Sequence, residues 1–154
     1  MVTVKQKMVV TQKLTGEAKS HSLTEVKARD VGSVIDEPAE RGGTNKGLTP
    51  TETLMASLMG CTNVVFQRVA HANGLHVGAL NIRLEAQFDR RGVTLQEEIE
   101  VPFPKITMYI DLKTDADDAK IAEAKRQLQM YCPVSKVIRA SGTELEEVWT
   151  IQRS

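Results

Sequence analysis

The sequence has few aromatic residues, no surplus of either charge and no long apolar run. Aromatic side chains make up 4% of the 154 residues, so the core must be built from aliphatic side chains and methionine. The 20 basic and 20 acidic residues cancel, and the basic ones are scattered, which argues against a nucleic-acid or membrane-surface protein. No apolar run approaches the roughly 20 residues that cross a bilayer. We therefore expect no nucleic acid and no membrane among its partners.

Cysteine is also scarce, which excludes a disulfide-stapled secreted scaffold. The two cysteines are Cys61 and Cys132, and no apolar targeting segment stands at the start, so we expect a cytoplasmic protein with reduced thiols. His21, His71 and His76 show no metal-ligand spacing. The sequence has no Cys-x-x-Cys pair and no Gly-rich phosphate loop after a strand. We expect neither a metal nor a bound cofactor.

The length and the apolar content of 41% are typical of one globular domain, which we expect to span residues 1–154. Residues 2–14 alternate between apolar and polar side chains, as a half-buried strand does, and Gly16 is expected to form the next turn. A second alternating stretch over residues 20–29 has a short continuation through Val34 and Ile35. This N-terminal third is typical of a meander of antiparallel strands.

A polar loop rich in Gly and Pro over residues 36–47 leads into the strongest helix signal. Thr49 is placed as N-cap, Pro50 as first helical residue and Glu52 as partner of the cap. We expect this helix to reach about Asn73, before Gly74. Its apolar residues form two stripes, one with Leu54, Leu58, Cys61, Val65 and Val69, the other with Met55, Met59 and Phe66. Because this arc is wider than a surface helix needs, we expect the helix to be central and covered on more than one side.

The second half of the sequence predicts strands and helices in alternation. Residues 80–88 and 106–112 alternate as strands do, and the polar residues 90–104 between them are expected to form a mobile connection or lid. A helix capped by Thr114 or Asp115 should end at Cys132. We expect the buried face of this helix to hold Ile121, Ala124, Leu128 and Tyr131. A short helix over residues 133–140 should follow, because Pro133 stands where a helix begins. The last strand is expected to carry Leu145, Val148, Trp149 and Ile151.

This order of elements predicts an α+β fold of antiparallel sheet with segregated helices. One small sheet covers one face of the long helix, whereas the helix is apolar over a wider arc. A second subunit that covers the remainder is the simplest solution, so we expect a homodimer.

The two cysteines are the first candidates for chemistry. Cys61 lies in the apolar stripe of the long helix, where a small core residue is the ordinary interpretation. Cys132 stands where a helix begins, and the N-terminus of a helix lowers a thiol pKa, although a cysteine there can also be a mere cap. Two-cysteine redox catalysis requires two thiols that can form a disulfide, and these two cysteines could supply them. Their separation in the sequence neither supports nor excludes a contact between them. Glu52 has a sufficient role as a helix cap, and it can reach Cys61 only across a dimer.

Two separated motifs resemble the OsmC/Ohr family of thiol peroxidases. One runs from residue 36 through Thr49-Pro50 to Leu58-Met59-Gly60-Cys61-Thr62, and the other is Cys132-Pro133-Val134-Ser135. The resemblance implies an intertwined homodimer in which antiparallel sheets wrap long central helices. It also implies reduction of organic hydroperoxides with a dithiol, in some members a lipoyl group. Cys61 then corresponds to the peroxidatic cysteine and Cys132 to the resolving one.

Two positions depart from the organic-hydroperoxide branch of that family. Thr51 stands where the branch has Glu, so that Glu52 lies one residue later on another face. Residues 19–21 hold no Arg where the branch has a thiolate-orienting one, and Arg29 is the nearest substitute, with Arg41 behind it. The loop and the second motif are more similar to the OsmC side of the family.

The sequence thus predicts a cysteine peroxidase in which Cys61 forms a sulfenic acid and then a disulfide with Cys132, recycled by a dithiol reductant. A non-catalytic dimeric binding protein for a small apolar ligand is the alternative. A Cys-His acyl-transfer enzyme ranks third, because no His lies at a motif-like position.

Overall fold

The computed structural model describes residues 7–153, and the chain divides into two units, residues 1–53 and 54–154. The first unit holds a three-stranded antiparallel sheet of β1 (Thr15–Ala18), β2 (Thr24–Ala28) and β3 (Val31–Ile35), in that order. The meander is therefore present, as the sequence predicted. The prediction of one domain stays a prediction.

The first strand lies later in the chain than its pattern suggested. Residues 2–6 of the predicted strand lie outside the described residues, and residues 7–14 are not in a strand. Gly16 lies within β1 rather than in a turn, and the chain reverses over residues 19–22 instead. The prediction was wrong because alternation shows only that a strand would have an apolar face, whereas pairing requires a partner elsewhere in the chain.

Residues 36–47 form a loop, as predicted, with a short 3₁₀ turn at Ala39–Arg41. The buried carboxylate of Asp36 organises this loop by accepting hydrogen bonds from the backbone amides of Glu37, Thr44 and Lys46 and from the Thr44 hydroxyl. These hydrogen bonds, the one to the Thr44 hydroxyl first, hold the pKa of Asp36 well below its usual range. The Asp36 side chain thus joins the start of the loop to its far end, beside backbone hydrogen bonds such as the one from the Asn45 amide to the Glu37 carbonyl.

The long helix α1 (Pro50–Ala72) confirms both predicted ends. At its start the Thr49 amide donates to Glu52 Oε2 (2.8 Å) and the Glu52 amide donates to Thr49 Oγ1 (3.2 Å), which is a capping box. At its end Gly74 has φ +61°, and the Leu75 amide donates to the Ala70 carbonyl, as in a Schellman motif.

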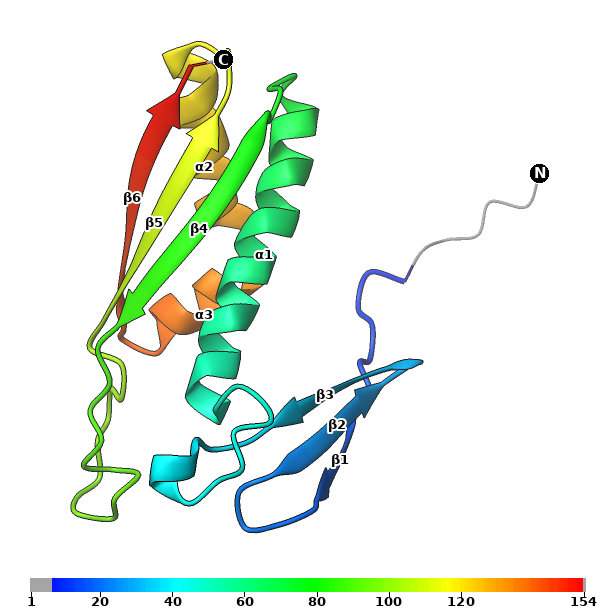
Figure 1. Cartoon of the computed structure of the whole chain (residues 1–154). Helices are drawn as coiled ribbons and strands as arrows, with labels where there is room; N and C mark the ends of the chain where they lie inside the picture. The colour runs from blue at the N-terminus through cyan, green and yellow to red at the C-terminus, as the bar shows by residue number, and fades with distance from the viewer. Residues whose placement is uncertain (1–6, 154) are drawn as a thin grey trace. The chain divides into compact units, whose positions relative to one another are not determined.

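The second unit consists of a mixed three-stranded sheet with helices on one face. The strands β4 (Ala79–Ala86), β5 (Lys105–Lys113) and β6 (Glu144–Gln152) lie in that order, with α2 (Asp118–Tyr131) and α3 (Pro133–Ala140) between β5 and β6 in sequence. Figure 1 shows α1, α2 and α3 beside this sheet. β4 pairs with β5 antiparallel, but β5 pairs with β6 parallel, which departs from the expected all-antiparallel sheet. The helical connection of α2 and α3 makes the parallel pairing possible.

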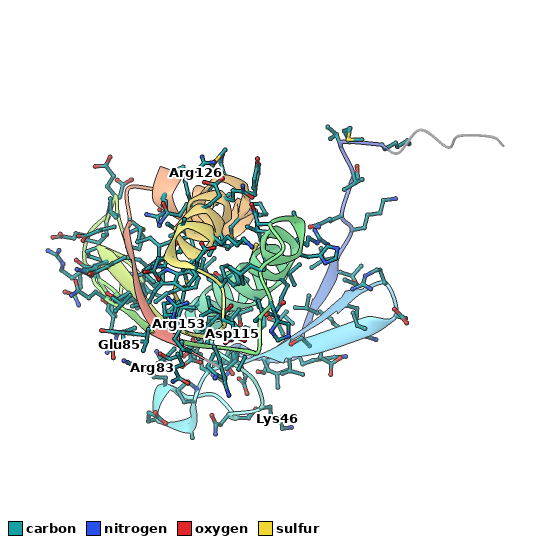
Figure 2. All side chains as sticks on the ribbon, turned by 90° about the horizontal axis from the view of Figure 1, so that it is seen from above. Lys46, Arg83, Glu85, Asp115, Arg126 and Arg153 are labelled. Carbon is teal, nitrogen blue, oxygen red and sulfur yellow. The ribbon has the colours of Figure 1, made fainter. Side chains whose placement is uncertain are left out.

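The core of this unit joins the inner face of the sheet to all three helices. Ile106, Met108, Ile110 and Leu112 of β5 are buried against residues of α1, α2 and α3. The opposite face of the sheet is polar, and Figure 2 shows its Arg83 and Glu85, which form an ion pair, on the other side of the unit from Arg126 of α2. The fold class is α+β, as predicted.

Two details of the second unit differ from expectation. The cap of α2 is Asp117, whose carboxylate accepts from the Lys120 amide, rather than Thr114 or Asp115. Tyr131 was expected on the buried face, but it is 59% exposed because it is the last residue of α2. Val148 lies in the last strand, as expected, on the outer face of β6. Residues 90–104 form an irregular connection, as expected, and whether it moves stays untested.

Candidate active site

Cys61 and Cys132 meet in the second unit. Their Sγ atoms lie 3.2 Å apart, within hydrogen-bond distance, and both thiols are reduced. Cys61 is on α1, and Cys132 is the residue that joins α2 to α3. The structure therefore brings together two residues that are separated by most of the second unit's sequence.

The joint that carries Cys132 follows from local sequence. Cys132 has extended backbone angles (φ −71°, ψ 106°) and caps both α2 and α3. Pro133 follows as the first residue of α3, where its missing N–H leaves no donor unsatisfied. The residue before a proline is driven away from helical angles, so α2 has to end here. The Cys-Pro pair thus places one sulfur at a sharp helix-to-helix junction.

The two thiols differ in exposure. Cys132 is 1% exposed, whereas Cys61 is half-buried. Cys132 packs with Phe66, Leu128 and other residues of the core, and Cys61 lies at the edge of the same cluster. A molecule that arrives from solvent can reach Cys61 but not Cys132.

The pKa of the Cys61 thiol is raised above its ordinary value. Burial is the main cause, because it disfavours the charged thiolate, and the neighbouring Cys132 thiol adds to the increase. The backbone amide of Val134 hydrogen-bonds to the sulfur and opposes the shift. The N-terminus of α3 therefore acts on Cys61, whereas the sequence predicted that it would act on Cys132.

The Val134 amide is a functional group that the sequence reasoning missed. A signal was present, because Pro133 has no N–H and the next residue therefore supplies the first free amide of α3. Which sulfur this amide faces depends on how α3 packs against α1, and no local pattern encodes that. Within residues 54–153, the Val134 amide and the Cys132 thiol are the polar groups facing the Cys61 sulfur.

The other predicted site residues belong to the first unit. Glu52 is the capping partner of Thr49, as the capping motif required. Arg29 lies in the two-residue turn between β2 and β3 with a left-handed φ of 55°, not on the strand where it was expected, and has no ion pair or side-chain hydrogen bond among residues 7–153. Arg41 is already paired, because its Nε lies 3.1 Å from Glu37 Oε2.

Within residues 7–153, no group of three or more His, Cys, Asp or Glu side chains could hold a metal ion. In the same part of the chain, no helix combines the length and the apolar character needed to span a membrane.

The family model described as "OsmC-like protein" matches residues 43–147, which include both cysteines and most of the second unit. The chain belongs to the OsmC-like protein family. The resemblance of the two cysteine motifs is thereby confirmed. A comparison of the chain with curated protein sequences found no match.

Solved structures of the same fold include several OsmC-like proteins. The OsmC-like protein of Mycoplasma pneumoniae has a TM-score of 0.75 at 13% identity, covering 95% of this chain and 99% of that one. An organic hydroperoxide resistance protein OsmC of Legionella pneumophila has a TM-score of 0.63 at 14% identity, covering 95% and 99%. The organic hydroperoxide resistance protein OhrB of Bacillus subtilis has a TM-score of 0.59 at 20% identity, covering 92% and 98%. At these identities the likeness concerns the fold.

Proposed function

We propose that this OsmC-like protein is a cysteine-based peroxidase that reduces organic hydroperoxides. The observation that carries the proposal is the pair of reduced thiols with sulfurs 3.2 Å apart. Two thiols in contact can together supply the two electrons that reduce a peroxide, and they need neither a metal nor a bound cofactor for this. Structural neighbours that include the Legionella pneumophila and Bacillus subtilis proteins are named organic hydroperoxide resistance proteins, which favours the same substrate class.

Exposure assigns the roles of the two cysteines. The half-buried Cys61 is the peroxidatic residue, because a peroxide can reach it, and the buried Cys132 is the resolving residue. The Cys61 thiolate attacks one oxygen of the hydroperoxide, the O–O bond breaks, and the alkoxide takes a proton to leave as an alcohol. Cys61 is now a sulfenic acid. The Cys132 sulfur attacks the Cys61 sulfur, the hydroxyl leaves with a proton as water, and a disulfide remains.

A cation is needed to favour the Cys61 thiolate, because burial raises the pKa of this thiol. Arg29 is our candidate, since its guanidinium has no ion pair among residues 7–153, whereas Arg41 is occupied by Glu37. Glu52 serves as the helix cap in this scheme, and any action of its carboxylate on the Cys61 thiol would have to come across the dimer.

The proposed assembly is a homodimer. Leu54 and Val64 of α1 are 40% and 48% exposed, although both are large apolar residues on the helix that carries Cys61. A second subunit that covers them would remove this apolar surface from water. An apolar surrounding also favours an organic over a small polar peroxide, since each buried CH₂ contributes about 0.8 kcal/mol.

The catalytic cycle closes when an external dithiol reduces the disulfide, and the resemblance to the family favours a lipoyl protein in this role. The reaction would take place in the cytoplasm, where thiols stay reduced.

The test measures consumption of cumene hydroperoxide with dihydrolipoamide as reductant. Wild-type protein should turn over, Cys61→Ser should be inactive, and Cys132→Ser should accumulate a sulfenic acid that dimedone traps. Thiol counting after one equivalent of peroxide separates the alternative, because a binding protein for an apolar ligand would keep both thiols. Turnover by Cys61→Ser at the wild-type rate would contradict the proposal.

A further inference from the structure

Glu147 is a charged residue at a position where β6 faces the core. The side chains of Leu145, Trp149 and Ile151 point to the same face, and the Glu147 side chain is 5% exposed. Transfer of a carboxylate from water to such a place is unfavourable unless the charge is paired and hydrogen-bonded. The Glu147 carboxylate at this place therefore depends on the groups that donate hydrogen bonds to it.

The carboxylate receives donors from three different elements. On Oε2 it accepts the indole N–H of Trp149 (3.1 Å, β6) and the amide of Gln129 (3.5 Å, α2). On Oε1 it accepts the guanidinium of Arg139 (3.4 Å, α3). The other nitrogen of the Arg139 fork donates to the Leu145 carbonyl (2.8 Å), which fixes this guanidinium against β6. Glu147 thus connects the strand to both helices that meet at Cys132.

The position of Cys132 depends on these two helices. Gln129 lies three residues before Cys132 and Arg139 seven residues after it, so the carboxylate holds one point on each arm of the joint. The core packing of Cys132 limits movement of the sulfur, but it supplies no directional contact to the sheet. The hydrogen bonds to Glu147 supply that direction.

The opposite sulfur is tied to the neighbouring strand. Thr62, the residue after Cys61, donates its hydroxyl to Met108 Sδ (3.6 Å). Met108 and Glu147 are direct partners in the parallel ladder of β5 and β6. Cys61 is therefore anchored through Thr62, and Cys132 through Gln129 and Arg139, to paired positions of the same sheet.

We propose that Glu147 is a positioning residue for the dithiol: its carboxylate holds the joint of α2 and α3 so that the Cys132 sulfur stays in line to close on Cys61. The proposal deepens the function proposed above and rests on it, because closure is its resolving step. Removal of the carboxylate should slow closure while the first reaction of Cys61 proceeds normally. A misplacement of about 1 Å can cost two orders of magnitude in such a step.

The experiment uses 2,2′-dithiodipyridine, which requires no peroxide. The Cys61 thiolate attacks the reagent's disulfide, releases one thiopyridone and becomes a mixed disulfide. The Cys132 thiolate then attacks the Cys61 sulfur, the second thiopyridone leaves, and the protein disulfide forms. The two releases are followed as two phases of absorbance in stopped flow, and intact mass identifies the intermediate.

The variant is Glu147→Gln, and the matched control is Glu146→Gln, which alters the next carboxylate on the polar face of β6, where it pairs with Lys105. We expect the second phase of Glu147→Gln to slow about tenfold, with the first phase and the control unchanged. Equal second phases in Glu147→Gln and wild type overturn the proposal. Slowing of both phases overturns it as well, because Glu147 would then be merely structural.

Arg139 provides a second route if Glu147→Gln does not fold. Arg139→Met should slow the second phase, and Arg139→Lys, which keeps the charge, should restore much of it; equal rates in all three proteins contradict the proposal. Failure of peroxide turnover in wild-type protein would remove the proposed function but leave this result standing, since closure is measured with a different oxidant.

Discussion

Oxidation of the cysteine pair should stabilise the protein markedly. The sulfurs are 3.2 Å apart and must approach by about 1 Å to form a disulfide, so little rearrangement of α1 or the joint is needed. The bond would close a loop of about 70 residues, which in the chain-entropy model stabilises the folded state by about 4 kcal/mol. For a chain of this size that corresponds to an increase in Tm of roughly 10 °C.

The assay compares thermal unfolding of dithiothreitol-reduced and diamide-oxidised protein, with peptide mapping of the oxidised sample. Cys132→Ser is treated in the same way as a matched control and should show no increase. Absence of a Cys61 to Cys132 bond in the map would refute the geometry. A mapped bond without an increase in Tm would refute the entropic reasoning instead.

Three further predictions concern the first unit. Glu52→Ala should lower the free energy of unfolding in urea by about 1 kcal/mol, because the capping box is lost, whereas Glu52→Gln should keep most of this stability and the peroxidase rate. A loss of rate in a stable Glu52→Gln protein would indicate a catalytic role. Arg29→Met should raise the pH midpoint of Cys61 alkylation by about one unit and Arg41→Met should leave it unchanged; the opposite pattern would assign the cation to Arg41. The pKa of Asp36 is lowered on folding, so its contribution to stability is present above the ordinary carboxyl pKa near 4 and is lost as pH falls below it. The free energies of unfolding of wild type and Asp36→Asn in urea should therefore converge in acid. A difference that stays constant with pH would contradict this.

Local signals were sufficient for both ends of α1 and for the boundary between α2 and α3, but not for the start of α2, where Asp117 is the cap. Thr49 and Glu52 define the start of α1, Gly74 its end, and the Cys132-Pro133 pair the boundary between α2 and α3. Each signal acts through backbone groups within a few residues, so the sequence contains the whole cause. The α+β fold class followed from the order of these elements, and the two cysteines were candidates for chemistry because of their places on the helices.

Non-local features were not accessible in the same way. The parallel pairing of β5 with β6 depends on where α2 and α3 return the chain, although a helical connection between two strands is itself a sign of parallel pairing. The short β1 is exposed along its length and carries no apolar alternation, so its pattern was invisible. The contact of the two sulfurs, the Val134 amide and the inward Glu147 all arise from packing between distant segments.

The position of β6 in the sequence determines when the sheet of the second unit can be completed during synthesis. β5 is the central strand, and one of its two neighbours is β6, which is made after both cysteines. Until β6 emerges from the ribosome, β5 has an unpaired edge and the joint of α2 and α3 lacks the strand against which it packs. The strand that carries Glu147 therefore reaches the joint of α2 and α3 only after both cysteines have been made.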